Sequence, residues 1–276
     1  MITAIVWSHN RAMNCHLLLE SIRKNIPGVF ETHVIYKADK PEYQSAYNDA
    51  VNHFVNDHFY GQSEHWNLER YTRKIIEETK NKEVAFFTDS TAIYKLSPLV
   101  GHEFLTKVRT DRAVFSLRLG YNTLIQNCHT GEIQAPLHMC VDEDQTISWN
   151  FNHHHPLTNY GYPFSIDGHI YSSDLMRNLI SHFRFNSVNE LESNLFHFKH
   201  RIPQSIRSFK HSIAVSIFNN QFTTEQLNAL YLIGSRISLA DIMTHQVMGC
   251  HQEIPFIITN PNSPKSPTNL KVSVHD

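Results

Sequence analysis

ITAIVWSHNRAMNCHLLLESIRKNIPGVFETHVIY, residues 2–36, is the stretch that decides the fold. Residues 2–7 are a continuous apolar run, and the polar turn SHNR follows at residues 8–11. Apolar residues then recur at helical spacing as far as Ile22, which predicts a helix. Residues 32–36 are a second run of β-branched and aromatic residues, typical of a strand. Strand, helix and strand at this spacing predict a βαβ unit, which implies a parallel sheet.

A further helix and strand follow along the chain. Residues 66–80 carry apolar residues at three- to four-residue spacing, which predicts a helix. Residues 84–87, VAFF, are an apolar strand, and TDST interrupts it at residues 88–91. Open α/β sheets bind ligands at the carboxyl ends of their strands. Asp89 is therefore the first residue to consider as a ligand contact.

The rest of the chain alternates between further predicted strands and helices. These are shorter mixed or antiparallel strands over residues 114–119 and 146–151, and helices starting near Ser173 and covering residues 189–198 and 223–232. We predict an α/β fold with a mixed, mainly parallel central sheet and flanking helices. Residues 1–258 are expected to form a single domain, and the proline-containing residues 259–276 an extended C-terminal tail.

Composition and charge exclude several classes of protein. The chain has 276 residues, 41% of them hydrophobic and 18% charged, which does not suit disorder. Its formal net charge of −2 gives no general attraction to nucleic acid, and we expect no nucleic-acid partner. No apolar run reaches the length of a transmembrane segment. The sequence does not decide whether the protein contacts a membrane peripherally. The first ten residues suit a buried strand better than a signal peptide.

The cysteines and histidines give little indication of a metal site. The four cysteines, at positions 15, 128, 140 and 250, form no CxxC pair, which favours free thiols in a reducing compartment and hence a cytoplasmic location. The cysteine spacing also gives no reason to expect structural zinc. Of the 20 histidines, residues 153–155 are consecutive. Because the side chains of adjacent residues point in different directions, we expect these three histidines to lie in a solvated loop and not to form a metal site.

Polar residues after the first two strands are candidate nucleotide contacts. Ser8, Asn10 and Arg11 lie in the first turn, where they could surround a base and offer a guanidinium to phosphate, with helix N-terminal amides assisting. An ordinary capped turn is the alternative. Asp39 follows the second strand and could accept a hydrogen bond from a base or ribose, although an aspartate before Lys40 and Pro41 is also a common turn residue.

Asp89 is a stronger candidate, because four apolar residues place it at the edge of a buried strand. One carboxylate there could contact a ribose or a divalent metal ion, and a capping aspartate is the alternative. Asp89 is the only acid in residues 88–91, whereas tight Mg²⁺ or Mn²⁺ binding recruits more protein ligands or borrows oxygens from phosphate. The sequence therefore leaves the use of a metal open.

Four later residues are candidates for acid–base or metal chemistry. Asp167 precedes Gly168, which permits a close backbone approach to a ligand or an unusual turn. Glu190 and Glu192 lie at a predicted helix start, where one could be a general base or both could complement the helix dipole. His251 could contact a metal or phosphate ahead of an expected apolar strand, or be a hydrogen-bonded structural histidine.

Several segments resemble the GT-A glycosyltransferases, particularly the bacterial family 2-like group. They are VWSHNRAMNCHLLLESI, VAFFTDSTAIY in the place of the family's DxD strand, FSIDGHIY followed by NELESNL, and FNNQFTTEQLNALYLIGSRI with CHQEIPF. The resemblance covers about residues 2–258. It implies a GT-A, Rossmann-like fold and a nucleotide-sugar donor.

The resemblance also implies roles for particular residues. Ser8, Asn10 and Arg11 would line the nucleotide, Asp39 would face the base, and Asp89 would match the first acid of the DxD motif. The family's later acid falls on Ser90 or Thr91 here, which leaves metal coordination in doubt or assigns it to His251 and the diphosphate. The family's catalytic base lies on a helix at a position that looks like Glu190 or Glu192, and Glu192 is favoured.

The leading hypothesis is therefore a glycosyltransferase that moves a sugar to a hydroxyl of a carbohydrate or glycolipid acceptor, in polysaccharide or lipopolysaccharide synthesis. Mn²⁺ or Mg²⁺ is an uncertain cofactor. A nucleotidyltransferase is a weaker alternative, because residues 8–13 contain no glycine for a phosphate loop. A catalytically inactive GT-A domain that binds carbohydrate or a partner protein is a further alternative, which the incomplete DxD motif favours.

Overall fold

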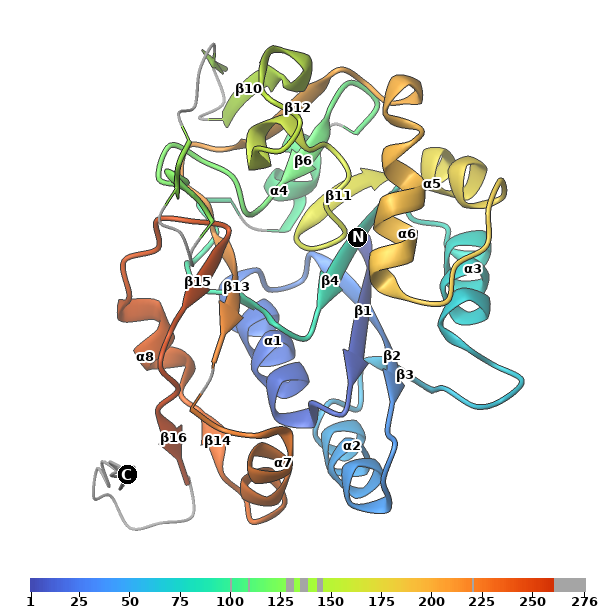
Figure 1. Cartoon of the computed structure of the whole chain (residues 1–276), viewed down its shortest axis with the longest axis vertical. Helices are drawn as coiled ribbons and strands as arrows, with labels where there is room; N and C mark the ends of the chain where they lie inside the picture. Colours follow the sequence, from blue (N-terminus) through green and yellow to red (C-terminus); the bar gives the residue numbers. More distant parts are fainter. Residues whose placement is uncertain are drawn as a thin grey trace.

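The computed structural model describes residues 1–99, 101–108, 110–127, 132–134, 139–142, 146–219 and 221–260. In this part of the chain a nine-stranded sheet forms the centre of the molecule (Figure 1). Its strands, in spatial order, are β3 (His58–Gly61), β2 (Phe30–Lys37), β1 (Ile2–His9), β4 (Glu83–Thr88), β11 (His169–Ser172), β6 (Val114–Ser116), β12 (Ser205–Phe209), β10 (Thr146–Asn150) and β9 (Cys140–Val141).

The sheet is mixed and mainly parallel, as predicted. β3, β2, β1 and β4 are parallel neighbours. β11 is antiparallel to both β4 and β6, β12 is parallel to β6, and β10 is antiparallel to both β12 and β9. Only β11 and β10 among the described strands of this sheet therefore run against the common direction. The predicted βαβ unit at the N-terminus is confirmed.

Eight α-helices accompany the sheet in the described residues. They are α1 (Ala12–Asn25), α2 (Pro41–His53), α3 (Leu68–Glu78), α4 (Gly101–Lys107), α5 (Ser173–Ile180), α6 (Val188–Phe196), α7 (Thr224–Leu232) and α8 (Leu239–Thr244). Short 3₁₀ turns cover Phe151–His153, Asn159–Gly161 and Lys199–Arg201. No helix among the described residues combines the length and apolar character needed to cross a membrane.

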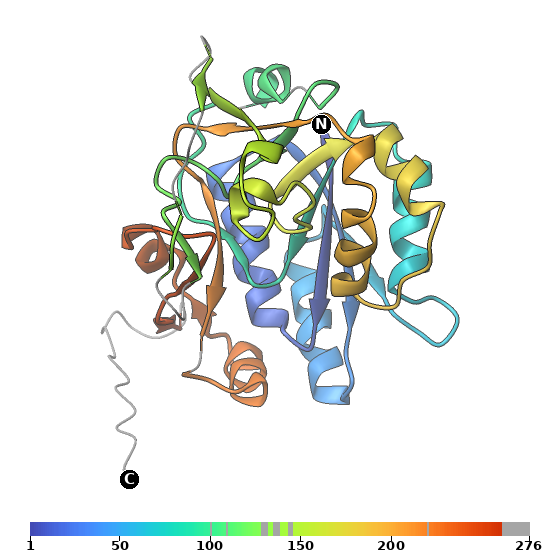
Figure 2. The same cartoon turned by 45° about the horizontal axis from the view of Figure 1, so that its top comes forward.

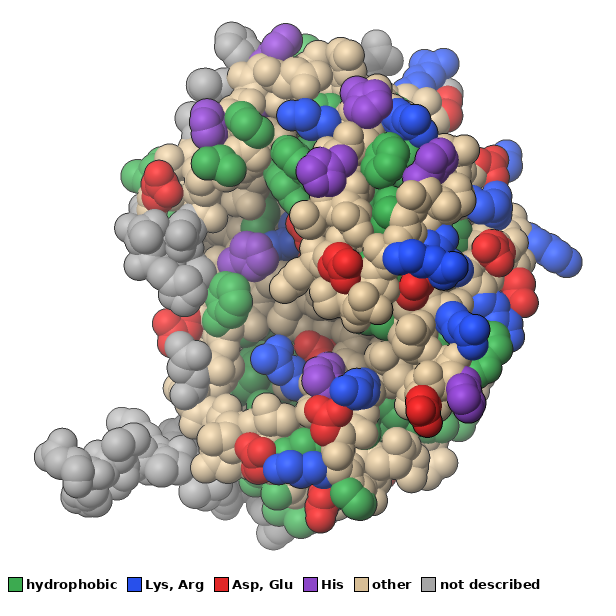
Figure 3. Space-filling view, turned by 45° about the vertical axis from the view of Figure 1, so that its right-hand side comes forward, with side chains coloured by type: hydrophobic (Ala, Val, Ile, Leu, Met, Phe, Trp, Pro, Cys, Tyr) green, Lys and Arg blue, Asp and Glu red, His purple; other side chains and the backbone are tan. Residues whose placement is uncertain are grey.

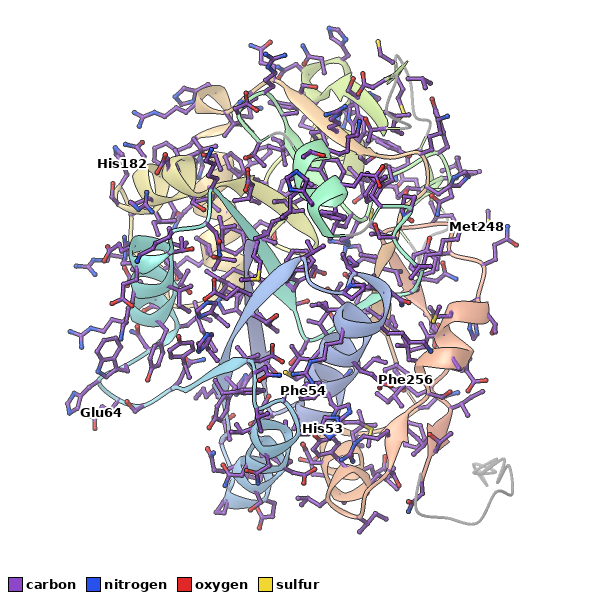
Figure 4. All side chains as sticks on the ribbon, turned by 180° about the vertical axis from the view of Figure 1, so that it is seen from behind. His53, Phe54, Glu64, His182, Met248 and Phe256 are labelled. Carbon is purple, nitrogen blue, oxygen red and sulfur yellow. The ribbon has the colours of Figure 1, made fainter. Side chains whose placement is uncertain are left out.

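The two faces of the sheet have separate apolar cores, because successive strand residues point to opposite sides. On β1, Ala4 and Val6 pack with residues of α1 and α2, whereas Ile5 and Trp7 pack with residues of α3, α5 and α6. Figure 2 shows α3, α5 and α6 grouped on one side of the sheet. The view from behind in Figure 4 shows α1 on the opposite side, with His53 and Phe54 at the end of α2.

Three small sheets complete the described fold. β15 (His251–Glu253), β13 (Ala214–Phe218) and β5 (Thr91–Ile93) form one, β14 (Arg236–Ile237) pairs with β16 (Ile258–Thr259), and β7 (Ile125–Asn127) pairs with β8 (Glu132–Ile133). His251 was expected to precede an apolar strand, but it begins β15 itself. Residues 254–257, the apolar residues that follow directly, are not in a strand, and Pro255 among them cannot donate to a ladder.

Two predictions fall wholly or partly on undescribed residues. Of the predicted tail, residues 261–276 lie outside the described residues, so the tail stays a prediction. Cys128 lies outside them as well. The three described cysteines, Cys15, Cys140 and Cys250, are free, which agrees with the prediction of free thiols.

Candidate active site

The carboxyl ends of β1, β2 and β4 meet at one edge of the sheet. The parallel register aligns Ser8 with Tyr36 and Trp7 with Thr88. A hollow of about 550 Å³ opens there, which we call the strand-end hollow. Its described lining is Trp7, Ser8, His9, Arg11, Lys37, Gln62, Leu68, Thr88, Asp89 and residues 186–189. Figure 3 shows the face of the molecule hollowed near its middle, with basic, acidic and histidine side chains gathered at the lower rim.

Asp89 lies in the wall of the strand-end hollow, held by the turn after β1. Its Oδ2 accepts hydrogen bonds from Ser8 Oγ at 2.9 Å and from the His9 amide at 3.1 Å. Its Oδ1 lies 3.6 Å from Arg11 Nη1. Burial raises the pKa of Asp89, and the Arg11 guanidinium and the Ser8 hydrogen bond oppose this shift. The structure therefore brings Ser8, Arg11 and Asp89 together.

Asp39 and Asn10 join the turns that follow β1 and β2. Asn10 has a φ of 61°, in the left-handed region that asparagine tolerates. Its Nδ2 donates to Asp39 Oδ2 at 2.8 Å, and its Oδ1 accepts from the Asp39 amide at 2.8 Å. Lys37 and His9 also contact the Asp39 carboxylate, at 3.0 and 2.6 Å. These partners hold the pKa of Asp39 well below its usual value.

Asp167 is buried behind the strand-end hollow, where its carboxylate is fully engaged. Oδ1 accepts from the Thr88 amide at 3.1 Å and from the Thr91 hydroxyl. Oδ2 accepts from the Ser216 hydroxyl and lies 3.5 Å from Arg118 Nη1. Because both oxygens have protein partners, the geometry gives Asp167 the role of joining β4, β5 and β13 and of positioning Arg118. Its predicted catalytic role is untested.

Arg118 is a buried residue at the centre of a second polar network. Nη1 donates to Ser165 Oγ and to the Asp167 carbonyl, both at 3.1 Å. Nη2 donates to the Cys250 carbonyl at 3.1 Å and to His251 Nε2 at 2.8 Å. Among the described residues, Arg118 Nε and His251 Nδ1 are buried without a hydrogen-bond partner. Such unpaired buried donors point to a ligand or water that binds beside them.

Glu192 lies on α6 and faces this network. Burial raises its pKa to about 7, and Arg118 and a hydrogen bond from Tyr162 oppose the shift. Leu191 and Leu195 are both fully buried, as the helical spacing predicts, and this orients the helix so that Glu192 is only partly exposed. A carboxyl group with a pKa near neutrality suits acid–base chemistry.

Glu190 has a different environment on the same helix. Its Oε2 accepts from the Asn186 amide at 2.8 Å, and its own amide donates to the Ser187 hydroxyl at 3.1 Å. These bonds satisfy amides at the start of α6, as helix caps do. Glu190 is exposed and is not among the described residues that line the hollows. Glu190 therefore contributes to the cap at the start of α6, and its predicted catalytic role is untested.

Three hollows adjoin one another along α6. The strand-end hollow shares Asn189 with a helix-side hollow of about 380 Å³, which is lined by Tyr162, Asn189, Glu192, Ser193, Phe196 and His197. Tyr162 and Glu192 also line an arginine hollow of about 70 Å³, which includes Arg118, His169 and His251. A further hollow of about 800 Å³ lies over β9, β10 and β12, and no acid is among the described residues that line it.

Asp89 and His251 were predicted to share a metal ion, and that pairing stays untested. They line different hollows. His251 directs Nε2 at the Arg118 guanidinium, and burial lowers the pKa of His251 to about 4. The positive charge of the Arg118 guanidinium beside Nε2 repels a metal ion that would bind to the same atom. These surroundings argue against a tight site formed by the two residues.

Sequence reasoning missed Arg118, Lys37 and Tyr162. Arg118 had a signal, because it is the only charged residue in the apolar run of residues 114–119. A charge in such a run must be paired when the strand is buried. Lys37 ends β2 and is aligned with His9 at the end of β1, so its strand-end position was a signal as well. We find no comparable sequence signal for Tyr162, because its role depends on the packing of α6 against a distant loop.

Comparison with solved structures finds TarS from S. aureus. One TarS structure matches with a TM-score of 0.50 and 14% identity over 88% of this chain and 41% of that chain. TarS 1–349 gives a TM-score of 0.48 at 13% identity, over 76% of this chain and 58% of that chain. The structure of TarS 1–349 in complex with UDP-GlcNAc gives a TM-score of 0.49 at 13% identity, over 88% of this chain and 70% of that chain.

The chain therefore spans about half the length of the first two of these chains. No protein-family model and no curated protein matches the sequence. At this identity the likeness to TarS concerns the fold. Together with the sheet topology, it confirms the predicted fold class, a GT-A, Rossmann-like α/β fold with a mixed, mainly parallel central sheet and flanking helices.

Proposed function

We propose that this protein is an enzyme that transfers a sugar from a nucleotide diphosphate sugar to a hydroxyl group. One observation carries the proposal. The strand-end hollow, with Arg11 and Lys37, adjoins the hollows that contain Glu192, whose pKa is about 7. Sugar transfer needs positive charge for the leaving diphosphate and a base beside the sugar carbon.

The strand-end hollow suits the donor. Arg11 and Lys37 bring two positive charges to its lining. α1 begins next to Arg11 and has no acidic residue in its first turn, so its N-terminal dipole favours an anion. The fold is shared with TarS, which has been crystallised with UDP and with UDP-GlcNAc. Ser8 and Asp89, which line this hollow, are the proposed contacts to the base and ribose. Asn10 and Asp39 are also proposed contacts, although they are not among the described lining residues.

The helix-side and arginine hollows suit the acceptor. Arg118 Nε and His251 Nδ1 can donate to acceptor oxygens. The acceptor oxygen bonds to the anomeric carbon as the bond from that carbon to the phosphate oxygen breaks. The hydroxyl proton passes to Glu192, and the electron pair leaves with the nucleoside diphosphate beside Arg11 and Lys37. A single displacement of this kind inverts the anomeric configuration.

The site fits a resident divalent metal ion poorly. Asp89 offers one oxygen that has no hydrogen bond, and Arg11 lies 3.6 Å from it. Asp167, the nearby second acid, has both oxygens engaged. Mg²⁺ and Mn²⁺ need more oxygen ligands than this lining supplies. We therefore assign the stabilisation of the diphosphate charge to Arg11 and Lys37, and Mn²⁺ or Mg²⁺ would bind weakly, mainly through the donor phosphates.

The acceptor is proposed to be a carbohydrate or glycolipid hydroxyl of polysaccharide or lipopolysaccharide synthesis, as in the family that the sequence resembles. The competing proposal is an inactive domain that binds carbohydrate or a partner protein. The short supply of metal ligands at Asp89 favours this alternative, because metal-dependent transfer needs more oxygen ligands than this lining supplies. The experiment below separates the two.

The test is thermal unfolding with UDP-, GDP- and dTDP-sugars, followed by a transfer assay with the sugar that binds. A true donor at 100 times its Kd stabilises the protein by about 2.7 kcal/mol. We expect Asp89→Asn to weaken donor binding about tenfold or more without a comparable fall in melting temperature, and the exposed Asp174→Asn on α5 is the control. EDTA should change donor affinity by less than about threefold, since metal bonds are few.

Each outcome has a defined meaning. Binding without transfer or donor hydrolysis supports the inactive domain. The absence of any shift with all three donor classes overturns the nucleotide-sugar proposal. Normal binding by Asp89→Asn removes that residue from the site.

A further inference from the structure

A cluster of metal-binding side chains lies outside the candidate active site. Glu31 and His33 are two residues apart on β2, and the pairing of β2 with β3 places His58 opposite His33. All three side chains therefore point to the same face of the sheet. One ligand atom from each lies within 4.8 Å of the others. The two strands form the edge of the large sheet (Figure 1).

The distances are close to those of a bound ion. Glu31 Oε1 lies 3.7 Å from His33 Nε2 and 3.8 Å from His58 Nε2. A tetrahedral zinc ion with bonds of about 2.0–2.1 Å holds its ligand atoms roughly 3.3–3.4 Å apart. Glu31 Oε1 must therefore approach each Nε2 atom by about half an ångström, and the two Nε2 atoms, which lie within 4.8 Å of each other, must also converge. The His58 side chain is 53% exposed, so its ring has room to make this movement.

A second set of residues already orients the cluster. The His33 Nδ1 lies 3.1 Å from the Tyr60 hydroxyl, and Asn81 Nδ2 donates to Glu31 Oε2 at 2.8 Å. Metal-binding histidines commonly use the second ring nitrogen in this way, which leaves the first free for the ion. The His33 and His58 rings also stack, with centroids 4.7 Å apart. Both Nε2 atoms thereby face the same carboxylate.

The charge of the cluster also suits a cation. Zinc binds the neutral imidazole form of histidine. Glu31 contributes one negative charge. Two imidazoles and one carboxylate are a donor set that favours zinc and similar transition metals over Mg²⁺ and Mn²⁺.

We propose that Glu31, His33 and His58 form a zinc site, with water as the fourth ligand. The cysteine spacing gave no reason to expect zinc, but a site made of histidine and glutamate needs no cysteine. His33 lies four residues before Lys37, the lining residue at the end of β2, which is about 13 Å along the strand. The site is therefore separate from the strand-end hollow and does not depend on the proposed transferase activity.

The position of the site indicates a structural role. β3 is a short edge strand that pairs with β2 over four residues. Exposed edge strands can separate or pair with other chains. A zinc ion shared by β2 and β3 would fasten this edge. Because Glu31 and His58 are 37% and 53% exposed, the ion can enter directly from solvent.

The test is titration of the tag-free full chain with zinc chloride, with Mg²⁺ and Mn²⁺ as comparison ions. We expect one zinc of micromolar or better affinity that Mg²⁺ and Mn²⁺ do not displace. His58→Ala and Glu31→Gln should each weaken this binding at least tenfold. His102→Ala, at an exposed histidine of α4, should leave it unchanged and controls for the many other histidines.

Thermal unfolding gives an independent readout. Zinc at 100 times its Kd should raise the melting temperature of the wild type by about 5 °C, and much less in His58→Ala. The metal-free melting temperature of His58→Ala and Glu31→Gln shows whether each variant folds. Equal zinc affinity in the wild type and both variants overturns the site, as does the absence of tight zinc binding. Donor binding should be unchanged in His58→Ala, so failure of this proposal is distinguishable from failure of the proposed function.

Discussion

Glu192 and Glu190 are the same amino acid two positions apart, and their surroundings give them different chemistry. The Glu190 carboxylate accepts an amide hydrogen bond in a helix cap, whereas burial raises the pKa of Glu192 to about 7. The family resemblance favoured Glu192, and the spacing of Leu191 and Leu195 supported that choice. It could not predict the raised pKa, because burial of Glu192 depends on residues such as Tyr162 that are distant in the chain.

The rate of transfer should report this pKa directly. A general base must be deprotonated, so we expect the rate to rise about tenfold per pH unit below pH 7 and to level off above it. Glu192→Gln should lower turnover by about 10² to 10⁴ while donor affinity is retained. Glu190→Gln should keep turnover within about twofold. A wild-type rate that is flat from pH 5.5 to 8, or equal loss of turnover in both variants, would exclude Glu192 as the base.

Individual residues at strand ends were predictable, and buried partners were not. Ser8, Arg11 and Asp89 follow apolar strands, and parallel strands end at the same edge of a sheet. The structure brings these three together. Asp167 was identified from its neighbour Gly168, but its partners Thr91, Ser216 and Arg118 come from separate segments. No local pattern contains that information.

At the scale of elements, long periodic segments were predicted and short or interrupted ones were missed. The predicted helix over residues 223–232 is α7, with the expected Thr223 cap. α2 was not predicted, although Pro41 at its start and its buried Tyr43, Ala46 and Tyr47 have helical spacing. β13 was also missed. It follows a polar stretch and pairs with β5 and β15, which are both too short to predict.

The junction before β11 gives a prediction at this scale. Gly168 has a φ of +73°, and an added Cβ would lie 2.7 Å from Arg118 Cγ and 2.8 Å from Cδ. Gly168→Ala therefore combines backbone strain with displacement of Arg118, and we expect it to lower the free energy of unfolding by about 2–4 kcal/mol. Gly28→Ala is a matched control, because Gly28 has a φ of +72° and open space around its Cβ. Gly28→Ala should lower the free energy of unfolding by about 1–2 kcal/mol, from backbone strain alone.

Denaturant unfolding of both variants measures the difference. If both variants lower the free energy of unfolding equally, Arg118 can move away from the added Cβ without destabilising the protein. The hydrogen-bond network around Arg118 would then contribute little to stability. A larger decrease in the free energy of unfolding for Gly168→Ala, together with a lower rate of transfer, would indicate that the Arg118 network supports both stability and activity.

At the scale of the molecule, the two apolar cores enclose histidines that remain neutral. His16 lies on α1 and contacts α2 and α7: its Nδ1 is 2.9 Å from the Tyr231 hydroxyl, and its ring centroid is 4.6 Å from that of His53. Burial lowers the pKa of His16 to about 3, and that of His169, on the central sheet, to about 3. Both histidines must charge when the protein unfolds in acid.

This arrangement predicts how stability depends on pH. The unfolded pKa of histidine is about 6.5, so between pH 6.5 and 3 the unfolded chain binds more protons, and stability falls as pH falls. His16 and His169 should each lower the free energy of unfolding by about 2 kcal/mol as the pH falls from 7 to 5. Glu192 acts in the opposite direction. Its folded pKa of about 7 exceeds its unfolded value of 4.5, so its contribution is fully present below pH 4.5 and is lost as pH rises from there to about 7.

Glu192→Gln removes that opposing contribution without changing the histidines. We therefore expect the wild type to lose stability between pH 7 and 5, and Glu192→Gln to lose about 2 kcal/mol more over the same range. Chemical unfolding of both proteins at the two pH values measures the two losses, and the exposed Glu190→Gln should behave as the wild type. If the wild type gains stability toward pH 5, the histidines charge inside the fold. If Glu192→Gln and the wild type lose equal amounts, Glu192 has an ordinary pKa, and the proposal that it is the catalytic base loses its physical basis.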